Sequence, residues 1–214
     1  MSSIGRIVVL VSVALFLSAS AQGNIIPNGD VETDDGGGAP ADWSTHDPSP
    51  DVDLVWDTGA SVSPTHSLLI DDRDQEPAGG GVGMGWWVSA KGAIPGGATE
   101  LDLSWQQRHE DISNEFFVTL RFWNPAGDGF MGESNFGIPQ GTNLDWVARN
   151  ETVAVVAGAG NVDLVIRSVG AGFTGLGTGK LWVDDVSIVP EPASALVALA
   201  GLSLFAVRRR RCRG

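Results

Sequence analysis

The sequence of 214 residues has a single cysteine, Cys212, and no tyrosine. One cysteine excludes a framework of intramolecular disulfides and a metal site built from several thiolates. Basic residues are also scarce, 13 against 26 acidic ones, which gives a formal net charge of −13. Because nucleic-acid binding depends on Lys and Arg contacts with phosphates, we expect no nucleic-acid partner. The hydrophobic fraction of 43% is nevertheless sufficient for a folded domain.

The charges divide the chain into three segments. Residues 1–21 contain one basic and no acidic residue, whereas residues 22–189 contain 7 basic and 25 acidic residues. Residues 190–214 contain five basic residues and one acidic residue. We therefore interpret residues 22–189, with a formal charge of −18, as the folded domain and the two positive ends as targeting segments.

The first segment has the pattern of a secretory signal peptide. Arg6 precedes an apolar run over residues 7–19, and Ala19-Ser20-Ala21 is typical of a signal peptidase site. The alternative, a membrane anchor, is disfavoured because the run is shorter than a transmembrane helix. The segment predicts export, with signal peptidase as a transient partner.

The last segment has three parts in order: a Pro-Glu-Pro box, an apolar stretch over residues 193–207 and an arginine cluster. The box is Pro190, Glu191 and Pro192, and the cluster is Arg208, Arg209, Arg210 and Arg211. A helix over the apolar stretch would span about 22 Å, which is marginal for a bilayer. The arginines favour the cytoplasmic side of the membrane. These features predict a short, weakly held C-terminal transmembrane helix.

This arrangement resembles the PEP-CTERM sorting signal of Gram-negative bacteria. The resemblance implies that an exosortase, a membrane-embedded cysteine transpeptidase, recognises the box and that the helix and basic tail are then removed. It also implies transient anchoring in the inner membrane. The destination would be the cell envelope, the cell surface or the extracellular polysaccharide matrix.

The central segment shows short runs of alternating or β-branched residues between Gly, Pro, Asn and Asp, without a clear helical period. The candidate strands are residues 24–26, 53–56, 67–70, 82–89, 100–109, 115–123, 144–157, 161–168 and 180–189. This pattern predicts an all-β fold, an antiparallel jelly-roll β-sandwich. Apolar positions that alternate along a strand, such as Phe116, Val118 and Leu120, should face the core between two sheets.

Motifs near both ends of the domain resemble those of jelly-roll carbohydrate-binding modules with a galactose-binding-like fold. They are NIIPNGDVE at residues 24–32, APADW at 39–43, SPTHSLLI at 63–70 and LWVDDVSI at 181–188. The resemblance implies a structural calcium ion between the first and last strands, with Glu32 and Asp184 as ligands and Asp30 and Asp185 beside them. The alternative for these acids is a set of solvated carboxylates at a strand end.

A polysaccharide-binding face would need exposed aromatic rings and planar polar groups. If the strands over residues 100–109 and 115–123 were neighbours, Gln106 and Arg108 would lie beside Arg121 and Trp123. Trp87 is the fifth candidate, because it and its neighbour Trp86 must point to opposite faces of their strand. The alternative for each tryptophan is packing in the core or at an edge.

Catalytic motifs are weak in this sequence. The three histidines have no zinc-ligand spacing, and no Gly-x-Ser-x-Gly motif occurs. A Gly-x-Gly-x-x-Gly match at residues 170–175 leads into a predicted strand, not a helix, and so does not indicate a dinucleotide site. We predict a non-catalytic surface or matrix protein that binds polysaccharide or has a structural role. The alternatives are a secreted polysaccharide hydrolase, since carboxylate pairs are abundant, and an envelope protein without a ligand.

Overall fold

The computed structural model describes residues 23–46, 52–72, 84–113, 116–169 and 178–191. The regular elements in these ranges are all strands. No helix in the described ranges is long and apolar enough to cross a membrane. The predicted signal peptide, residues 1–21, and the predicted C-terminal helix and arginine cluster lie outside these ranges.

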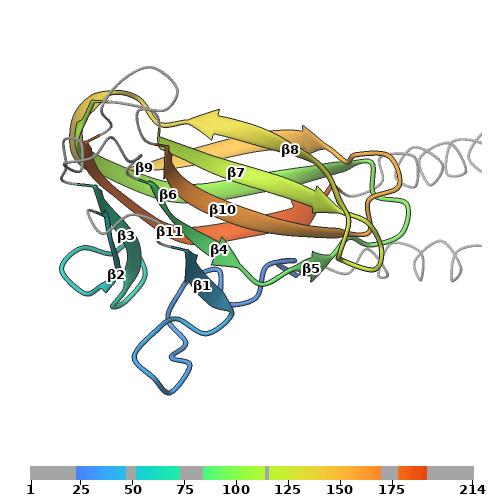
Figure 1. Ribbon diagram of the computed structural model, residues 1–214, viewed down its shortest axis with the longest axis horizontal. Coiled ribbons are helices and arrows are strands. Elements are labelled where there is room, and N and C mark those ends of the chain that lie inside the picture. The colour runs from blue at the N-terminus through green and yellow to red at the C-terminus, as the bar shows by residue number, and fades with distance from the viewer. Residues whose placement is uncertain (1–22, 47–51, 73–83, 114–115, 170–177, 192–214) are drawn as a thin grey trace, which may run out of the picture.

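Two antiparallel sheets pack face to face (Figure 1). The first has the strand order β1-β4-β10-β7-β8, with the short β5 paired to β10, and the second has the order β2-β3-β11-β6-β9. The strands of the first sheet are β1 (Trp43–His46), β4 (Met84–Ser89), β5 (Gly92–Ala93), β7 (Phe116–Trp123), β8 (Phe130–Gly137) and β10 (Asn161–Val169). Those of the second are β2 (Val52–Asp57), β3 (Ser67–Asp72), β6 (Glu100–Ile112), β9 (Gly141–Ala154) and β11 (Gly179–Pro190).

The structure confirms the prediction of an antiparallel β-sandwich. Every predicted strand except 24–26 overlaps an observed one. The prediction for 24–26 is wrong: this segment is irregular, although the N–H of Ile25 donates to the carbonyl of Ile188 at 2.8 Å. The strands β1, β5 and β8 are additional to those predicted.

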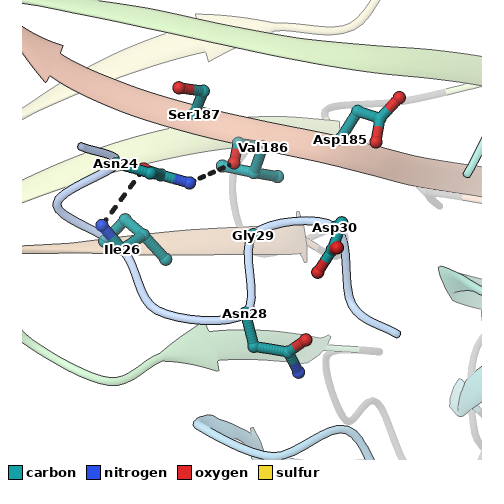
Figure 2. Close-up of a pocket in the computed structure, with 8 residues that line it drawn as sticks. All are labelled: Asn24, Ile26, Asn28, Gly29, Asp30, Asp185, Val186 and Ser187. Carbon is teal, nitrogen blue, oxygen red and sulfur yellow. Dashed lines mark hydrogen bonds between the residues drawn. The ribbon is translucent and has the colours of Figure 1, made fainter. Parts of the chain in front are cut away.

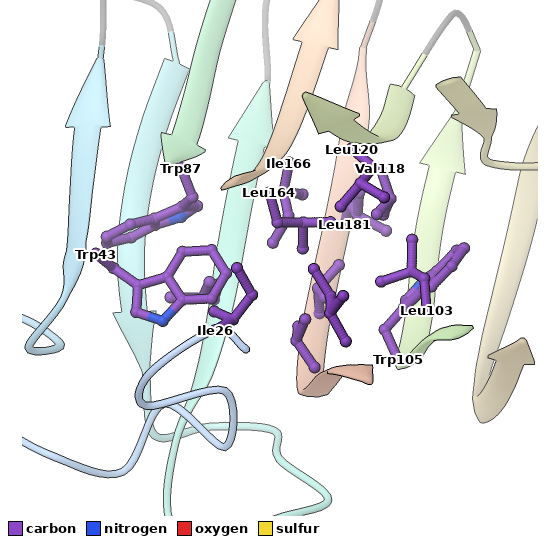
Figure 3. Packing of buried hydrophobic residues seen from close by; sticks show 14 of the residues in the cluster. Ile26, Trp43, Trp87, Leu103, Trp105, Val118, Leu120, Leu164, Ile166 and Leu181 are labelled. Carbon is purple, nitrogen blue, oxygen red and sulfur yellow. The ribbon is translucent and has the colours of Figure 1, made fainter. Parts of the chain in front are cut away.

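The core consists of apolar side chains that point inward from both sheets (Figure 3). Leu103 and Trp105 on β6 pack in one cluster with Leu120 on β7 and Leu164 on β10, and all four are almost completely buried. Burial of each such side chain contributes about 1.5–3 kcal/mol. The predicted alternation of core and outward residues in these strands is therefore confirmed.

Consecutive strands repeatedly cross from one sheet to the other. β6 and β7 follow each other in the chain but belong to different sheets, as do β8 and β9, and β10 and β11. This connectivity is that of a jelly roll. It also means that the outer faces of β6 and β7 lie on opposite sides of the molecule.

A bulge interrupts β11 near its middle. The register with β6 shifts between Asp184 and Ser187, and Asp185 has a positive φ of 49°. An extra residue in one strand shifts the alternation of its side chains. Val183 before the bulge and Val186 after it therefore both face the core. Asp184, which follows Val183 before the bulge, lies on the opposite face of β11 from Val186.

Candidate functional site

The N-terminal segment is attached to the last strand by side-chain hydrogen bonds. The amide of Asn24 donates from Nδ2 to the carbonyl of Val186 at 2.7 Å, and its Oδ1 accepts the N–H of Ile188 at 2.8 Å. Gly29 passes so close to β11 that a Cβ would lie 2.0 Å from the Val186 carbonyl oxygen. Glycine permits such an approach because it has no side chain. Two residues of the 24–32 motif thus hold the two ends of the domain together.

An open groove of about 370 Å³ follows this junction (Figure 2). It is lined by Asn24, Ile26, Asn28, Gly29, Asp30, Asp185, Val186 and Ser187. The amide of Asn28 is already engaged with carbonyl oxygens of the chain, at 2.7 and 3.2 Å. The groove therefore lies between the N-terminal segment and β11, and the carboxylates of Asp30 and Asp185 are part of its lining.

The predicted calcium ligands Glu32 and Asp184 meet at one turn, residues 62–66. The fully buried carboxylate of Asp184 accepts two backbone N–H groups of this turn, at 2.7 and 2.9 Å. Glu32 accepts two more, at 3.0 and 2.8 Å. The turn includes the start of the 63–70 motif, so three separate sequence motifs converge in space.

The hydroxyl of Ser63 lies at the centre of this convergence. Within hydrogen-bond distance of its Oγ are Glu32 Oε1 at 2.7 Å, the Asp184 oxygens at 2.9 and 3.0 Å, and the carbonyl oxygens of Asp30 and His66 at 3.1 Å each. A hydroxyl has one hydrogen to donate, so it cannot satisfy five acceptors. Ser63 therefore donates to one of these oxygens, while backbone N–H groups of the turn and of Asp185 also donate to the two carboxylates.

Four carboxylates lie close together here and repel one another: Asp30, Glu32, Asp184 and Asp185. Burial raises the pKa of Asp185, and the negative charges of Asp184, Asp30 and Glu32 raise it further. Burial also acts against ionised Glu32, but hydrogen bonds from the turn 62–66 outweigh it and lower the pKa of Glu32 to about 2. The cluster thus keeps Glu32 ionised while it penalises the charge on Asp185.

The residues around Ser63 offer few carboxylates to a metal ion. In the described part of the chain, no group of three or more His, Cys, Asp or Glu side chains is placed to hold a metal. A cation here would depend on the carboxylates of Glu32 and Asp184, with carbonyl oxygens such as that of Asp30 and the Ser63 hydroxyl completing the shell. Calcium accepts such a mixture of six to eight hard oxygens. Asp185 lies beside this set, and its N–H donates to Asp184 Oδ1 at 2.7 Å.

Charged side chains cover the outer face of the first sheet. Arg121 on β7 forms a bidentate ion pair with Asp163 on β10, both contacts being 2.8 Å. Arg167 on β10 donates to Glu133 at 3.1 Å and to Asn135 at 2.8 Å, both on β8. Each guanidinium group is thereby held in a defined orientation.

An aromatic cluster lies at one end of this face. Trp123 and Phe130 are opposite each other in the pairing of β7 with β8, with ring centroids 5.8 Å apart and planes at 75°. The Lys91 ammonium lies 3.6 Å from the centre of the Trp123 ring and donates to the Gly127 carbonyl at 2.5 Å. Arg121 also lies over Trp123, at 5.2 Å. Phe130, which is 55% exposed, therefore provides the more open ring surface.

Aromatic side chains also lie at the other end of the face. His46 on β1 stacks on Trp86 on β4 with centroids 4.3 Å apart. Trp86 is opposite Arg167, which in turn is opposite Phe117 on β7. Phe117 and Trp123 are six residues apart, about 20 Å along a strand. The face thus has rings at both ends and polar groups between them.

Trp87, a predicted sugar-binding residue, does not belong to this face. It is 3% exposed, and its Nε1 donates to the carbonyl of Leu69 at 3.0 Å in the core. Strand alternation requires one of the two adjacent tryptophans to point outward. In the pairing with β10, Trp86 is opposite the outward Arg167, and Trp87 is opposite the buried Ile166. The prediction for Trp87 is wrong because the alternation alone does not specify which residue faces the core.

Gln106 and Arg108 lie on the outer face of the second sheet, on β6. The guanidinium of Arg108 packs over the ring of Trp182, 4.7 Å from its centroid. The prediction that these two residues adjoin Arg121 and Trp123 is wrong, because the chain crosses to the other sheet between β6 and β7. Of the five predicted sugar-binding residues, Arg121 and Trp123 are the two that lie together on the first sheet.

Apart from Arg121 and Trp123, the residues of this face were not among the predicted site residues. They include Lys91, Phe130, Glu133 and Asn135. Three of them belong to β8, whose sequence FMGESNFG contains two glycines and no clear alternation. The turn residues at 124–129 before β8, NPAGDG, are a hairpin signal that would have indicated this strand.

The start of the Pro-Glu-Pro box is part of the folded domain. Pro190 is the last residue of β11, is buried and is opposite Leu101. The N–H of Glu191 donates to the carbonyl of Glu100 at 3.2 Å. Pro192 and the predicted cluster of Arg208 to Arg211 lie outside the described residues.

No protein-family model matches this chain, and no curated protein does. Solved structures with a similar fold include the enzymatically active domain of bacteriophage CBA120 tailspike protein 4, with TM-score 0.56, 14% identity and coverage of 78% of this chain and 21% of that one. The module TmCBM61, in complex with β-1,4-galactotriose, has TM-score 0.50 and 13% identity, with coverage of 78% and 99%. The arabinose-bound α-L-arabinofuranosidase MgGH51 has TM-score 0.53 and 18% identity, with coverage of 79% and 26%.

These similarities concern the fold. The chain spans about a fifth of the tailspike chain and about a quarter of the arabinofuranosidase chain, but nearly all of the carbohydrate-binding module. The domain therefore has the jelly-roll β-sandwich fold of a carbohydrate-binding module.

Proposed function

We propose that this protein is an exported, non-catalytic protein of the cell surface or the extracellular polysaccharide matrix, and that it binds polysaccharide. The observation that carries the proposal is the outer face of β7, β8 and β10. There, ring systems at both ends flank ion-paired Arg121 and Arg167. Rings stack on the apolar faces of sugars, and guanidinium, amide and carboxylate groups bond to hydroxyls.

The ion pairs prepare this face for binding. Because Arg121 and Arg167 are already oriented by carboxylates, fewer side-chain rotamers have to be immobilised when a ligand binds. The size of the domain also supports a self-sufficient binding unit, since TmCBM61, described with a bound galactotriose, has nearly the same extent. The two enzymes are several times longer than the matched region, so their activities do not follow for this chain.

Binding to a panel of neutral and acidic polysaccharides, measured by affinity electrophoresis and calorimetry, tests the proposal. We expect retention by at least one glycan, reduced about two- to tenfold by Phe130→Ala, since a lost stacking contact costs on the order of 0.5–1.5 kcal/mol. Leu144→Ala is the matched control, because Leu144 is 51% exposed on β9, on the other sheet. Equal loss in both variants would contradict the placement of the binding face.

The same panel distinguishes the alternatives. Turnover of a glycan that a single carboxylate substitution abolishes would favour the hydrolase over the binding protein. Absence of both binding and turnover would favour an envelope protein without a ligand.

We further propose a structural calcium ion, with Glu32 and Asp184 as the carboxylate ligands. What supports it is the convergence of the Glu32 and Asp184 carboxylates with the Asp30 carbonyl oxygen at Ser63, and the mutual repulsion of the acids. Calcium should raise the unfolding temperature, and chelator should lower it, since an ion that binds the folded state stabilises it. Asp184→Asn should remove this response, whereas Asp145→Asn, an exposed residue on β9, should retain it. An unfolding temperature that is insensitive to calcium in the unmutated protein would refute this site.

We also propose export through residues 1–21 and exosortase sorting through residues 190–214. The support is the order of the three parts in the C-terminal segment. The intact mass of the protein recovered from its cells should correspond to a chain that begins at Gln22 and has lost the arginine cluster. A mature protein that still contains residues 193–214 would indicate a plain membrane anchor instead.

A further inference from the structure

The acidic residues of this domain are unevenly distributed between the strands of the two sheets. Residues 22–189 contain 7 basic and 25 acidic residues. Three of the basic residues, Lys91, Arg121 and Arg167, lie at the outer face of the first sheet. Along the described parts of β4, β10, β7 and β8, the carboxylates on this face are Asp163 and Glu133, and each is paired with an arginine. Lys91 lies just before β5 and Asp128 lies in the turn before β8, so the charges at this face nearly balance in a strongly negative molecule.

Lys91 differs from the two arginines of this face in its partners. Its side chain is exposed, and among the described residues no carboxylate lies within 4.0 Å of its ammonium group. The ring of Trp123 and the carbonyl of Gly127 hold the ammonium in place. An ammonium has three N–H donors, and the carbonyl uses one. Asp128, next to Gly127, accepts a hydrogen bond from Asn124 at 2.8 Å.

The outer face of the second sheet carries two basic side chains, Arg108 and Lys180, among more numerous carboxylates. Lys180 on β11 lies between two carboxylates, 3.6 Å from Asp71 on β3 and 4.0 Å from Glu110 on β6. In the same row, Asp53 on β2 is opposite Asp71. A polyanion is repelled by such a row, so the charge distribution would direct it to the first sheet.

We propose that the end of the face formed by Lys91, Trp123 and Phe130 binds an acidic sugar of an anionic polysaccharide. The proposal rests on the proposed polysaccharide-binding function and names its ligand class. The exposed ring of Phe130 stacks against the sugar, and the carboxylate or sulfate group of the sugar forms an ion pair with the Lys91 ammonium. Uronic acids and sulfated sugars both present such an anion, and the test separates them.

The test uses protein purified after expression of the full chain, with three probes: polygalacturonate as the carboxylate polymer, κ-carrageenan as the sulfated polymer and β-1,4-galactan as the neutral one. We expect tighter binding to one or both acidic polymers than to galactan, weakening as salt rises from about 50 to about 500 mM. Preference for polygalacturonate identifies a carboxylate ligand, and preference for carrageenan a sulfate ester.

Variants at Lys91 locate the contact. Lys91→Met should lower the affinity for the preferred acidic polymer about tenfold or more, since a hydrogen bond between charged groups is lost. Lys91→Arg should retain most of the affinity because it keeps the charge. The matched control is Lys180→Met on the second sheet, whose side chain is 39% exposed and whose loss should not weaken binding.

Two outcomes would overturn the inference. If galactan binds as tightly as both acidic polymers, or if Lys91→Met and Lys180→Met behave alike, the acidic-sugar site is wrong while the polysaccharide-binding function stands. If none of the three probes nor the wider glycan panel binds, the proposed function fails together with it.

Discussion

Two carboxyl groups at the junction of the first and last segments respond in opposite ways to their surroundings. The turn 62–66 donates hydrogen bonds that keep Glu32 ionised, with a pKa of about 2. Asp185 sits in a strand bulge at φ 49°, where burial and neighbouring acids raise its pKa. The difference follows from the donors that each group receives, not from its residue type.

Gly29→Ala should destabilise the domain strongly, because the added Cβ would lie 2.0 Å from the Val186 carbonyl oxygen. Relief of this clash requires the N-terminal segment to move off β11, so we expect a loss on the order of 2–4 kcal/mol. Thermal or urea unfolding measures it. Gly96→Ala is the control, since nothing lies within 4 Å of a Cβ there. Similar stability of the two variants would contradict the close packing of this junction.

His109 should make stability depend on pH in the mildly acidic range. It is 5% exposed on the inward side of β6, and burial lowers the pKa of His109. As pH falls below about 6.5, the unfolded chain takes up this proton before the folded one, so stability decreases, by at most about 1.4 kcal/mol per pH unit. Above that pH the residue contributes no pH dependence.

The check is urea unfolding of the unmutated protein and of His109→Phe at pH 8 and pH 5.5. The variant should lose less stability between the two values. Parallel losses would show that His109 does not titrate in this way.

At the scale of elements, the pairing of β7 with β10 and β8 determines the character of the outer face. Arg121 and Asp163 are directly opposite in the β7-β10 register, and Arg121 and Glu133 in the β7-β8 register. Cross-strand pairs of opposite charge stabilise a sheet, and here they also hold the guanidinium groups in place. The same contacts therefore serve both the sheet and the proposed binding face.

The two carboxylates of this face should differ in their contribution to stability. The Asp163 side chain is 2% exposed, whereas that of Glu133 is 29% exposed. Removal of one partner of a buried pair leaves a charge without compensation, so Asp163→Ala should cost about 3 kcal/mol. Glu133→Ala should cost less than about 1 kcal/mol, as for partly solvated pairs. Urea unfolding of both variants tests this, and a larger cost for Glu133→Ala would contradict it.

At the scale of the whole molecule, the two ends of the domain lie side by side. Ile25 is hydrogen-bonded to Ile188, and Asn24 bonds to two residues of β11. The segment over residues 24–29 thus acts as a clasp that crosses the last strand, next to the proposed calcium ligands. Trimming of the chain at its N-terminal end should therefore weaken the entire sandwich.

A chain over residues 30–191 should be less stable than one over residues 24–191. It lacks the hydrogen bonds of Asn24 and the buried Ile26, whose burial alone contributes about 1.5–3 kcal/mol. The urea midpoint measures the difference. A chain over residues 23–191 is the control, because Gly23 is exposed and has nothing within 4 Å of a Cβ. Equal midpoints for all three chains would contradict the role of the clasp.

The sequence by itself determined the fold class and most strands, because the alternation of apolar residues is a local property with a period of two. The resemblance of its motifs to those of carbohydrate-binding modules also implied that Glu32 and Asp184 lie near each other. The tertiary structure brought Ser63 between them and placed Lys91 and Phe130 beside Trp123.

The tertiary structure alone decided which polar strand faces share a surface. Arg108 and Arg121 stand in successive strands with similar alternation, yet they lie on opposite sides of the sandwich. Sheet membership depends on where the chain crosses between layers, and the bulge at Asp185 changes which residues of β11 face inward. Both are set by contacts between residues far apart in the chain, which local alternation does not record.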